Sequence, residues 1–213
     1  KQIFEFSQAL KNEEFKLYFQ PKCSFENGNI CSAEVLTRWQ NVKMGIVPPD
    51  QFIPVFERNG LIIKLDFYVL EQALKTLRIW LDEGINPCKI SINFSRLHLK
   101  DELSLPKIKI LLDMYKVPAN LLEFEITESA VMSNTSETKK FIEGLHAMGI
   151  SVAMDDFGSG YSSLHLLKKN SKQVKVNLNT QKDVLLLKSQ TKISVMQKKQ
   201  KLEMLLLKSF ALM

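Results

Sequence analysis

The chain has 213 residues, of which 45% are hydrophobic and 24% are charged, and its formal net charge at pH 7 is +6. This composition is ordinary for a globular protein, and it excludes the disordered and fibrous classes. The sequence contains no apolar run near the roughly 18 residues that a membrane span requires.

The excess positive charge is concentrated in lysines after residue 167, whereas the candidate site residues described below are mostly acidic. We therefore expect no duplex nucleic acid partner and no membrane contact from this segment. The chain begins Lys1-Gln-Ile without a cleavable signal pattern, so we expect a cytoplasmic piece of a longer polypeptide. Three cysteines without a CxxC spacing predict reduced core thiols rather than disulfides or a thiolate zinc site.

The first part of the chain predicts a helix followed by a β-hairpin. Residues 1–14 are expected to form an amphipathic lead-in helix, and the alternation of apolar and polar residues over 15–20 predicts a strand. Asn27-Gly28 precedes a second extended run at 30–38, and Asn-Gly between extended segments is a hairpin signal. The first two strands are therefore expected to be antiparallel.

After a loop rich in glycine and proline, the pattern alternates between helices and strands. A capping box of Asn134 and Glu137 is predicted to begin the last helix before the strand at 150–155. The other expected helices cover 50–60, 65–83 and 104–116, and the other expected strands cover 89–94 and 121–127.

Each of the later strands has an apolar face and a polar face. Glu125 lies on the polar face of its strand, and Asn93 and Asp155 have equivalent places in the strands before and after it. The three are about 30 residues apart, which is roughly one βα unit. Repeated βα units with helix-covered apolar faces are typical of a parallel barrel whose site lies at the carboxyl ends of the strands. We therefore expect an α/β fold, a TIM-like barrel, with these three side chains on one rim.

Two adjacent carboxylates, Asp155 and Asp156, lie where the last predicted strand ends. Like charges on neighbouring residues repel, so a nearby cation would stabilise them. With Glu34, Asn93 and Glu125 they would form a site of oxygen ligands, which favours Mg²⁺ or Mn²⁺ over zinc or copper. Two such ions can activate water for attack on a phosphodiester. Arg38 and Lys175 lie on strand faces from which they could take the phosphate charge.

Each of these residues also has a structural interpretation, which the sequence leaves open. The two aspartates could form a solvated turn, and Glu125 could form an ion pair with Arg38. Lys175 could be an ordinary surface lysine. The remaining alternatives are a solvated hairpin residue for Glu34, a rim amide for Asn93, a charge at a helix start for Glu128, and packing for Gln20 and Leu36.

At these residues the sequence resembles the EAL family of cyclic di-GMP phosphodiesterases. The matching segments occur in the family's order between residues 1 and 177. They are Tyr18-Phe-Gln-Pro21, Ala33-Glu-Val-Leu-Thr-Arg-Trp39 (with the name motif as Glu34-Val35-Leu36), Pro48-Pro-Asp-Gln-Phe-Ile-Pro54, Ile92-Asn-Phe-Ser95, Leu122-Glu-Phe-Glu-Ile-Thr-Glu-Ser129 and Asp155-Asp-Phe-Gly-Ser-Gly-Tyr-Ser-Ser-Leu164.

The resemblance implies a modified TIM-like barrel with one reversed strand, in agreement with the predicted hairpin. It also implies hydrolysis of cyclic di-GMP to linear pGpG at a site that holds two Mg²⁺ or Mn²⁺ ions. The implied roles are metal ligation for Glu34, Asn93, Glu125, Asp155 and Asp156, dinucleotide contact for Gln20, Leu36 and Arg38, loop support for Glu128, and catalysis for Glu34 and Lys175.

The resemblance weakens after the glycine-rich loop. The family's Lys-Ile-Asp strand is represented by Lys175-Val-Asn177, and its later Glu-Gly-Val-Glu segment is absent. We therefore divide the chain into a lead-in helix or linker at 1–14, an EAL-type barrel at 15–177 and a divergent tail at 178–213. A complete barrel takes about 250 residues, so the last one or two βα units are expected to be missing or degenerate. An uncovered sheet edge would then favour a homo-oligomer.

Three functional interpretations follow from this resemblance. In the first, the chain is a metal-dependent cyclic di-GMP phosphodiesterase within a longer multidomain signalling protein. In the second, the absent Glu-Gly-Val-Glu segment makes it a catalytically inactive EAL-like domain that binds cyclic di-GMP or a protein partner as a sensor. In the third, it is a truncated piece of an enzyme.

Overall fold

A mixed parallel and antiparallel sheet organises the chain. The computed structural model describes residues 2–24, 27–127, 130–131 and 135–155. The strands are β1 (Phe15–Cys23), β2 (Ile30–Asn41), β3 (Gly45–Val47), β4 (Lys89–Asn93), β5 (Leu122–Thr127) and β6 (Ser151–Asp155). The helices are α1 (Gln2–Lys11), α2 (Pro49–Arg58), α3 (Ile62–Asp82), α4 (Ser104–Tyr115) and α6 (Ser136–Ala147), with short 3-10 helices η1 (Arg96–Lys100) and η2 (Ala119–Leu121).

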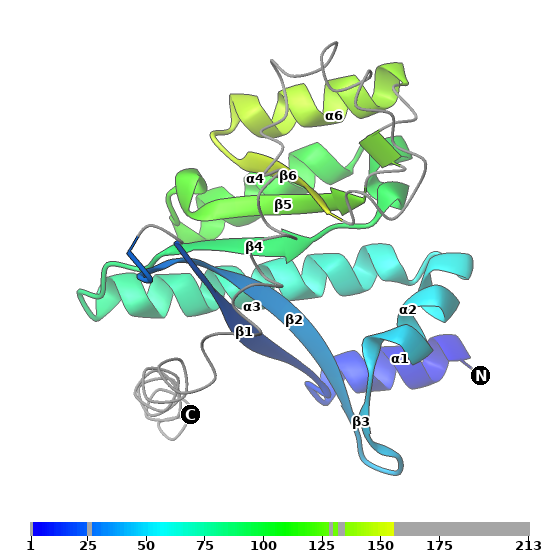
Figure 1. Ribbon diagram of the computed structural model, residues 1–213. Coiled ribbons are helices and arrows are strands. Elements are labelled where there is room, and N and C mark those ends of the chain that lie inside the picture. Colours follow the sequence, from blue (N-terminus) through cyan, green and yellow to red (C-terminus); the bar gives the residue numbers. More distant parts are fainter. Residues whose placement is uncertain (1, 25–26, 128–129, 132–134, 156–213) are drawn as a thin grey trace. The chain divides into compact units, whose positions relative to one another are not determined.

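The strand order explains how distant residues reach one surface. The sheet follows the path β1-β2-β4-β5-β6, and β3 pairs with β2 beside this path (Figure 1). β1 and β2 are antiparallel, whereas β2, β4, β5 and β6 run parallel to one another. Gly28, at φ 66°, supplies the left-handed backbone that the turn between β1 and β2 uses. The predicted hairpin and its reversed strand are therefore confirmed.

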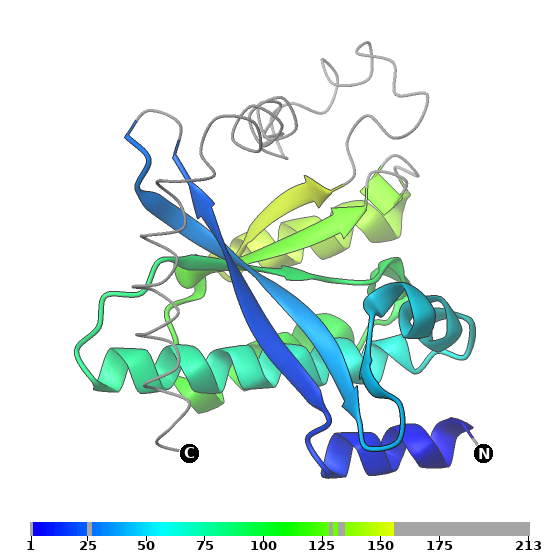
Figure 2. The same ribbon diagram turned by 60° about the horizontal axis from the view of Figure 1, so that its bottom comes forward.

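The apolar faces of the parallel strands pack against the helices. Figures 1 and 2 show α3, α4 and α6 beside the same sheet. The leucine stripe of α3 has helical spacing, so its side chains meet the strands on one side. Each such buried side chain contributes about 1.5–3 kcal/mol relative to an exposed one. The side chains with no exposed surface include Leu70, Leu74, Leu77, Ile90, Ile92, Leu122 and Phe124.

Aromatic side chains join α1 and α2 to the open end of the β1–β2 hairpin, opposite its turn. The rings of Phe6 on α1 and Phe56 on α2 lie edge to face at 4.9 Å between centroids. Phe15 of β1 stacks on Trp39 of β2 at 5.4 Å. The Trp39 indole N–H also donates to Glu14 Oε2 at 2.9 Å. The start of the chain is therefore packed against the first two strands.

Two local predictions are wrong in their details. The loop expected after β2 contains the short strand β3, because the Asn41 side chain accepts hydrogen bonds from the backbone N–H groups of Lys43 and Met44 and closes a tight turn. α6 is capped by Thr135 rather than by Asn134. The Thr135 hydroxyl accepts from the Thr138 N–H at 3.2 Å, which is the N-cap to N3 spacing.

The prediction of core cysteines is wrong for Cys23 and Cys31, whereas Cys88 packs against the apolar core. Cys31 is exposed, and Cys23 and Cys88 are only partly buried. Cys23 is the last residue of β1, and Cys31 is the second residue of β2. All three thiols are free in this structure.

No helix in the described part of the chain is both long enough and apolar enough to cross a membrane. The predicted tail at 178–213, with its expected missing or degenerate βα units, lies outside the described residues.

Tyr115 gives a test of the contact between α4 and α3, since its hydroxyl donates to Glu71 Oε1 at 2.7 Å. Burial, and then the bond to Glu71 and its charge, raise the pKa of Tyr115 to about 12. An acid with a raised folded-state pKa gives stability that is complete below its unfolded pKa and is lost as pH rises through the folded pKa. We expect Tyr115→Phe to lower the free energy of unfolding by about 1 kcal/mol at pH 7.

The same substitution should remove the part of the stability loss between about pH 10 and 12 that comes from Tyr115. Urea denaturation of both proteins across this range measures the difference. Identical pH dependence in the two proteins would show that the Tyr115–Glu71 bond contributes nothing.

Candidate functional site

The candidate site is built on the face of the sheet opposite the apolar core, which we call the polar face. The register sets Glu34 of β2 beside Ser91 of β4, and Asn93 of β4 beside Glu125 of β5. The next row toward the carboxyl ends sets Thr127 beside Asp155 of β6. Residues of one row point to the same side of a sheet. The four predicted ligands from β2, β4, β5 and β6 therefore lie on one face.

Two of these side chains are joined directly. Asn93 Nδ2 donates a hydrogen bond to Glu34 Oε1 at 3.0 Å. This bond commits the amide N–H₂ of Asn93 to a carboxylate, and it leaves the amide oxygen as the ligand-type atom of that side chain. β2 and β4 are thus tied together at the level of the site.

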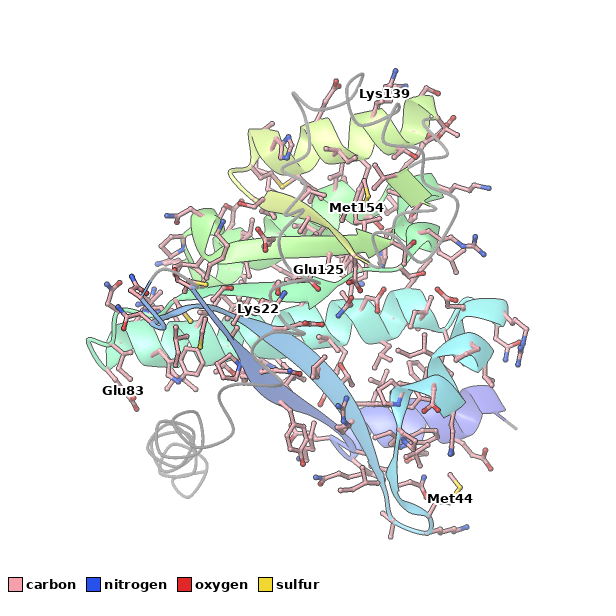
Figure 3. All side chains as sticks on the ribbon, in the orientation of Figure 1. Lys22, Met44, Glu83, Glu125, Lys139 and Met154 are labelled. Carbon is pink, nitrogen blue, oxygen red and sulfur yellow. The ribbon has the colours of Figure 1, made fainter. Side chains whose placement is uncertain are left out.

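A lysine from β1 lies between the two glutamates. The Lys22 ammonium contacts Glu125 Oε1 and lies 3.6 Å from Glu34 Oε2. It also donates to the hydroxyl of the buried Ser91 at 3.0 Å. Figure 3 shows Lys22 and Glu125 reaching toward each other from β1 and β5. The Glu125 side chain is only 7% exposed, so the carboxylate of this charge pair is largely shielded from water.

The pKa values follow from this crowding. Burial raises the pKa of Glu34, and the negative charge of Glu125 raises it further, while Lys22 and the bond from Asn93 oppose the rise. Asp155 adds a smaller repulsion. For Lys22, burial acts to lower the pKa, but the bond to Glu125 and the surrounding glutamate charges outweigh it and raise the pKa above its ordinary value. The polar face is therefore an acidic surface that attracts a cation.

The donor types fit a hard divalent ion. Carboxylate and amide oxygens converge from neighbouring strands without a thiolate or imidazole, and an ammonium group already bridges two of the carboxylates. Within the described residues, no three histidine, cysteine, aspartate or glutamate side chains come close enough to form a metal site by themselves. Asp156, the adjacent acidic residue, lies outside the described residues, as do Glu128 and Lys175.

The three residues that are predicted to contact the dinucleotide lie on the β1–β2 hairpin. Gln20 pairs with Glu34 across β1 and β2, and Leu36 pairs with Tyr18. Arg38 lies further along β2, and its guanidinium donates to the backbone oxygen of Thr37 at 3.0 Å. The alternative ion pair between Glu125 and Arg38 is wrong, because Lys22 is the cation that contacts Glu125.

Lys22 is the site residue that sequence reasoning missed. The predicted strand ended at Gln20, before Pro21, whereas β1 continues to Cys23. The signal was present in the alternation itself, because Lys22 follows Gln20 by two residues and therefore shares its face. A second polar group that sequence reasoning left without a role is His98, which is completely buried and bonded to Asp66 and Ser104.

Residues 4–181 match the EAL domain family. The chain belongs to this family. Its fold is accordingly the TIM-like α/β barrel of EAL domains, with β1 antiparallel to the parallel strands β2, β4, β5 and β6. The predicted family and fold class are both confirmed.

Known relatives match most of the chain. The bifunctional diguanylate cyclase/cyclic di-GMP phosphodiesterase MucR of Pseudomonas aeruginosa is 34% identical over 167 residues, which are 78% of this chain and 24% of MucR. The solved PaMucR phosphodiesterase in complex with c-di-GMP has a TM-score of 0.72 at 34% identity, and the match covers 78% of this chain and 68% of that one.

A further solved relative is the FimX EAL domain from Pseudomonas aeruginosa bound to c-di-GMP. It has a TM-score of 0.69 at 28% identity, and the match covers 82% of this chain and 68% of that domain. The chain therefore corresponds to most of an EAL domain, and it spans about a quarter of the length of MucR.

Proposed function

We propose that this chain is the EAL region of a phosphodiesterase that hydrolyses cyclic di-GMP to linear pGpG with Mg²⁺ or Mn²⁺. The observation that carries this proposal is the convergence of Glu34, Asn93 and Glu125 from three neighbouring strands, with Asn93 bonded to Glu34 and the Lys22 ammonium against the two glutamates. The named relatives, cyclic di-GMP phosphodiesterases among them, support the choice of substrate.

In this proposal the chain's own side chains hold the reacting groups in place. The divalent ions, when bound, supply a water that is acidic enough to attack near neutral pH, and they supply positive charge for the phosphodiester. Gln20, Leu36 and Arg38 orient the dinucleotide, Lys175 carries a positive charge toward the phosphate and Glu128 supports the loop that follows β6. The proposed metal ligands are Glu34, Asn93, Glu125, Asp155 and Asp156.

The hydrogen bond from Asn93 has a role in this arrangement. It fixes the Glu34 carboxylate against rotation, so that Glu34 Oε2 faces the space shared with Glu125. Preorganised carboxylates need little rearrangement when a cation binds. The bond thereby holds the Glu34 and Asn93 side chains of β2 and β4 together on one side of the proposed site.

A second candidate function is binding of cyclic di-GMP without turnover. It is favoured by Asn177, which stands where the family's Lys-Ile-Asp strand has an aspartate. In that case the polar face would serve as a ligand-dependent sensor. In either case we propose that the chain is part of a longer signalling protein, in line with its 24% share of MucR. A cytoplasmic location is proposed with it, because reduced cysteines are typical of that compartment.

The test follows linear product from cyclic di-GMP in the presence of Mg²⁺ or Mn²⁺. We expect Glu34→Ala to abolish hydrolysis, because it removes both a ligand charge and the acceptor of Asn93. Glu123→Ala is the matched control. Its side chain has the same 23% exposure on the same face, but it pairs with Lys89 instead of Lys22.

Loss of hydrolysis in Glu34→Ala with activity retained in Glu123→Ala supports the phosphodiesterase. Tight binding of cyclic di-GMP without product supports the sensor. If the wild-type chain neither binds nor hydrolyses cyclic di-GMP, both functions are rejected.

A further inference from the structure

Lys22 and Lys89 are two lysines of the polar face with different surroundings. Each side chain is 35% exposed, and each donates to a serine hydroxyl at about the same distance, 3.0 Å to Ser91 for Lys22 and 2.8 Å to Ser151 for Lys89. Lys89 lies 3.8 Å from Glu123, which is not a proposed ligand. Lys22 contacts two carboxylates that are proposed ligands.

We propose that Lys22 is a built-in counter-ion of the Glu34–Glu125 carboxylate pair and competes with a divalent cation for it. The inference rests on the proposed function, since it concerns the same ligands. It assigns Lys22 a role in setting metal affinity. Lys22 is thus a positioning residue that acts through Glu34 and Glu125.

The geometry allows this competition. Lys22 pairs with Ser32, which precedes Glu34 by two residues on β2. Its ammonium therefore approaches the two glutamates from the amino-terminal side of β2, away from the carboxyl ends of the parallel strands. The oxygens that it contacts, Glu34 Oε2 and Glu125 Oε1, are atoms of the kind that a divalent ion would bind. A positive charge left within a few ångströms of such an ion repels it. Displacement of the ammonium is feasible because the Ser91 hydroxyl remains as a partner.

The same contacts explain why a counter-ion is needed. Glu34 and Glu125 repel each other, and Asp155 adds to the negative charge. Burying carboxylates without a partner is costly, so the metal-free face would be strained without Lys22. The lysine therefore stabilises the carboxylate pair when no metal is bound, and it weakens the binding of a metal.

The test compares Mn²⁺ binding by isothermal titration calorimetry in the wild-type chain, Lys22→Met and Lys89→Met, with thermal unfolding in EDTA as a second readout. Groups next to a metal site typically change its affinity by about 10–100-fold. We expect Lys22→Met to bind Mn²⁺ about tenfold more tightly and to have a lower melting temperature in EDTA. Lys89→Met should bind Mn²⁺ as the wild type does, and Lys22→Arg should remain close to the wild type because it keeps the charge.

Tighter Mn²⁺ binding by Lys22→Met is a gain that a merely damaged fold would not produce. Unchanged or weaker affinity in Lys22→Met, or an equal gain in Lys89→Met, would overturn the counter-ion role while leaving the proposed function intact. If neither the wild type nor Lys22→Met binds Mn²⁺, both the counter-ion role and the metal-dependent function are rejected.

Discussion

Asp66→Ala is expected to lower the free energy of unfolding by about 3 kcal/mol, because it breaks a buried network behind β4. The Asp66 carboxylate on α3 accepts a hydrogen bond from the Ser95 N–H at 3.0 Å and lies 3.1 Å from His98 Nε2. Asp66 is 7% exposed and His98 is not exposed at all. Each buried polar group left without a partner costs about 1–3 kcal/mol. Denaturation by urea in metal-free buffer measures the loss.

The hydrogen-bond partners in this network indicate which atoms carry the protons. The Ser104 hydroxyl donates to Asp101 Oδ2 at 3.0 Å, so it accepts from His98 Nδ1 at 2.8 Å. One proton then remains to be shared between His98 Nε2 and Asp66, and the pair is neutral overall wherever that proton lies. Burial raises the pKa of Asp66 most strongly, while the bond and charge of His98 oppose it. The two side chains therefore depend on each other.

A double-mutant cycle separates this dependence from simple loss of packing. We expect His98→Leu to destabilise the protein on its own, and Asp66→Ala with His98→Leu to be less damaging than the sum of the two single changes by about 1–3 kcal/mol. His98 also stacks on Phe94 at 3.8 Å between ring centroids, a contact that leucine replaces in part. Strict additivity of the two changes would show that the Asp66–His98 contact contributes no free energy of its own.

The elements that the sequence predicts well are those whose hydrophobic period is long and regular. The leucine spacing of α3 and the alternation in β4, β5 and β6 each indicate one apolar face, and the structure buries that face. The same alternation predicts that Asn93 and Glu125 share the polar face, as the register shows. Periodicity succeeds here because burial of one face is the largest energetic term in each element.

The contacts that the sequence does not predict depend on partners that are far apart along the chain. Lys22 reaches Glu125 from 103 residues away, and the contact requires the registers of three strand pairs at once, β1–β2, β2–β4 and β4–β5. His98 meets Asp66 only after α3 and η1 have packed together. Local rules also leave small errors of position, since Thr135 and Asn134 are both good N-cap residues and only the helix geometry decides between them.

Glu125→Gln is expected to reduce cyclic di-GMP hydrolysis by about 100-fold or more, if the proposed function is correct. Glutamine keeps the shape of the side chain and removes its charge. Glu125 is the most buried of the described carboxylates on the polar face, and a bound divalent ion supplies several kcal/mol of charge stabilisation that depends on such ligands. Each 1.36 kcal/mol that is lost lowers the rate tenfold. The measurement is the initial rate of linear product at saturating Mn²⁺.

Glu123→Gln is the control for this prediction, because it lies two residues earlier on β5, faces the same side and pairs with Lys89 at 3.8 Å. It loses one negative charge from the polar face but no proposed ligand, so its rate should stay within a few-fold of the wild type. A general electrostatic effect would slow both variants alike, whereas ligand loss slows only Glu125→Gln. A rate in Glu125→Gln close to that of Glu123→Gln would mean that Glu125 serves only as the partner of Lys22.

Because Lys22 lies against Glu125 in the described structure, the charge lost in Glu125→Gln also leaves this ammonium with Glu34 as its nearest carboxylate. Adding Lys22→Met to Glu125→Gln removes that unbalanced charge, and it should restore stability in EDTA without restoring the rate.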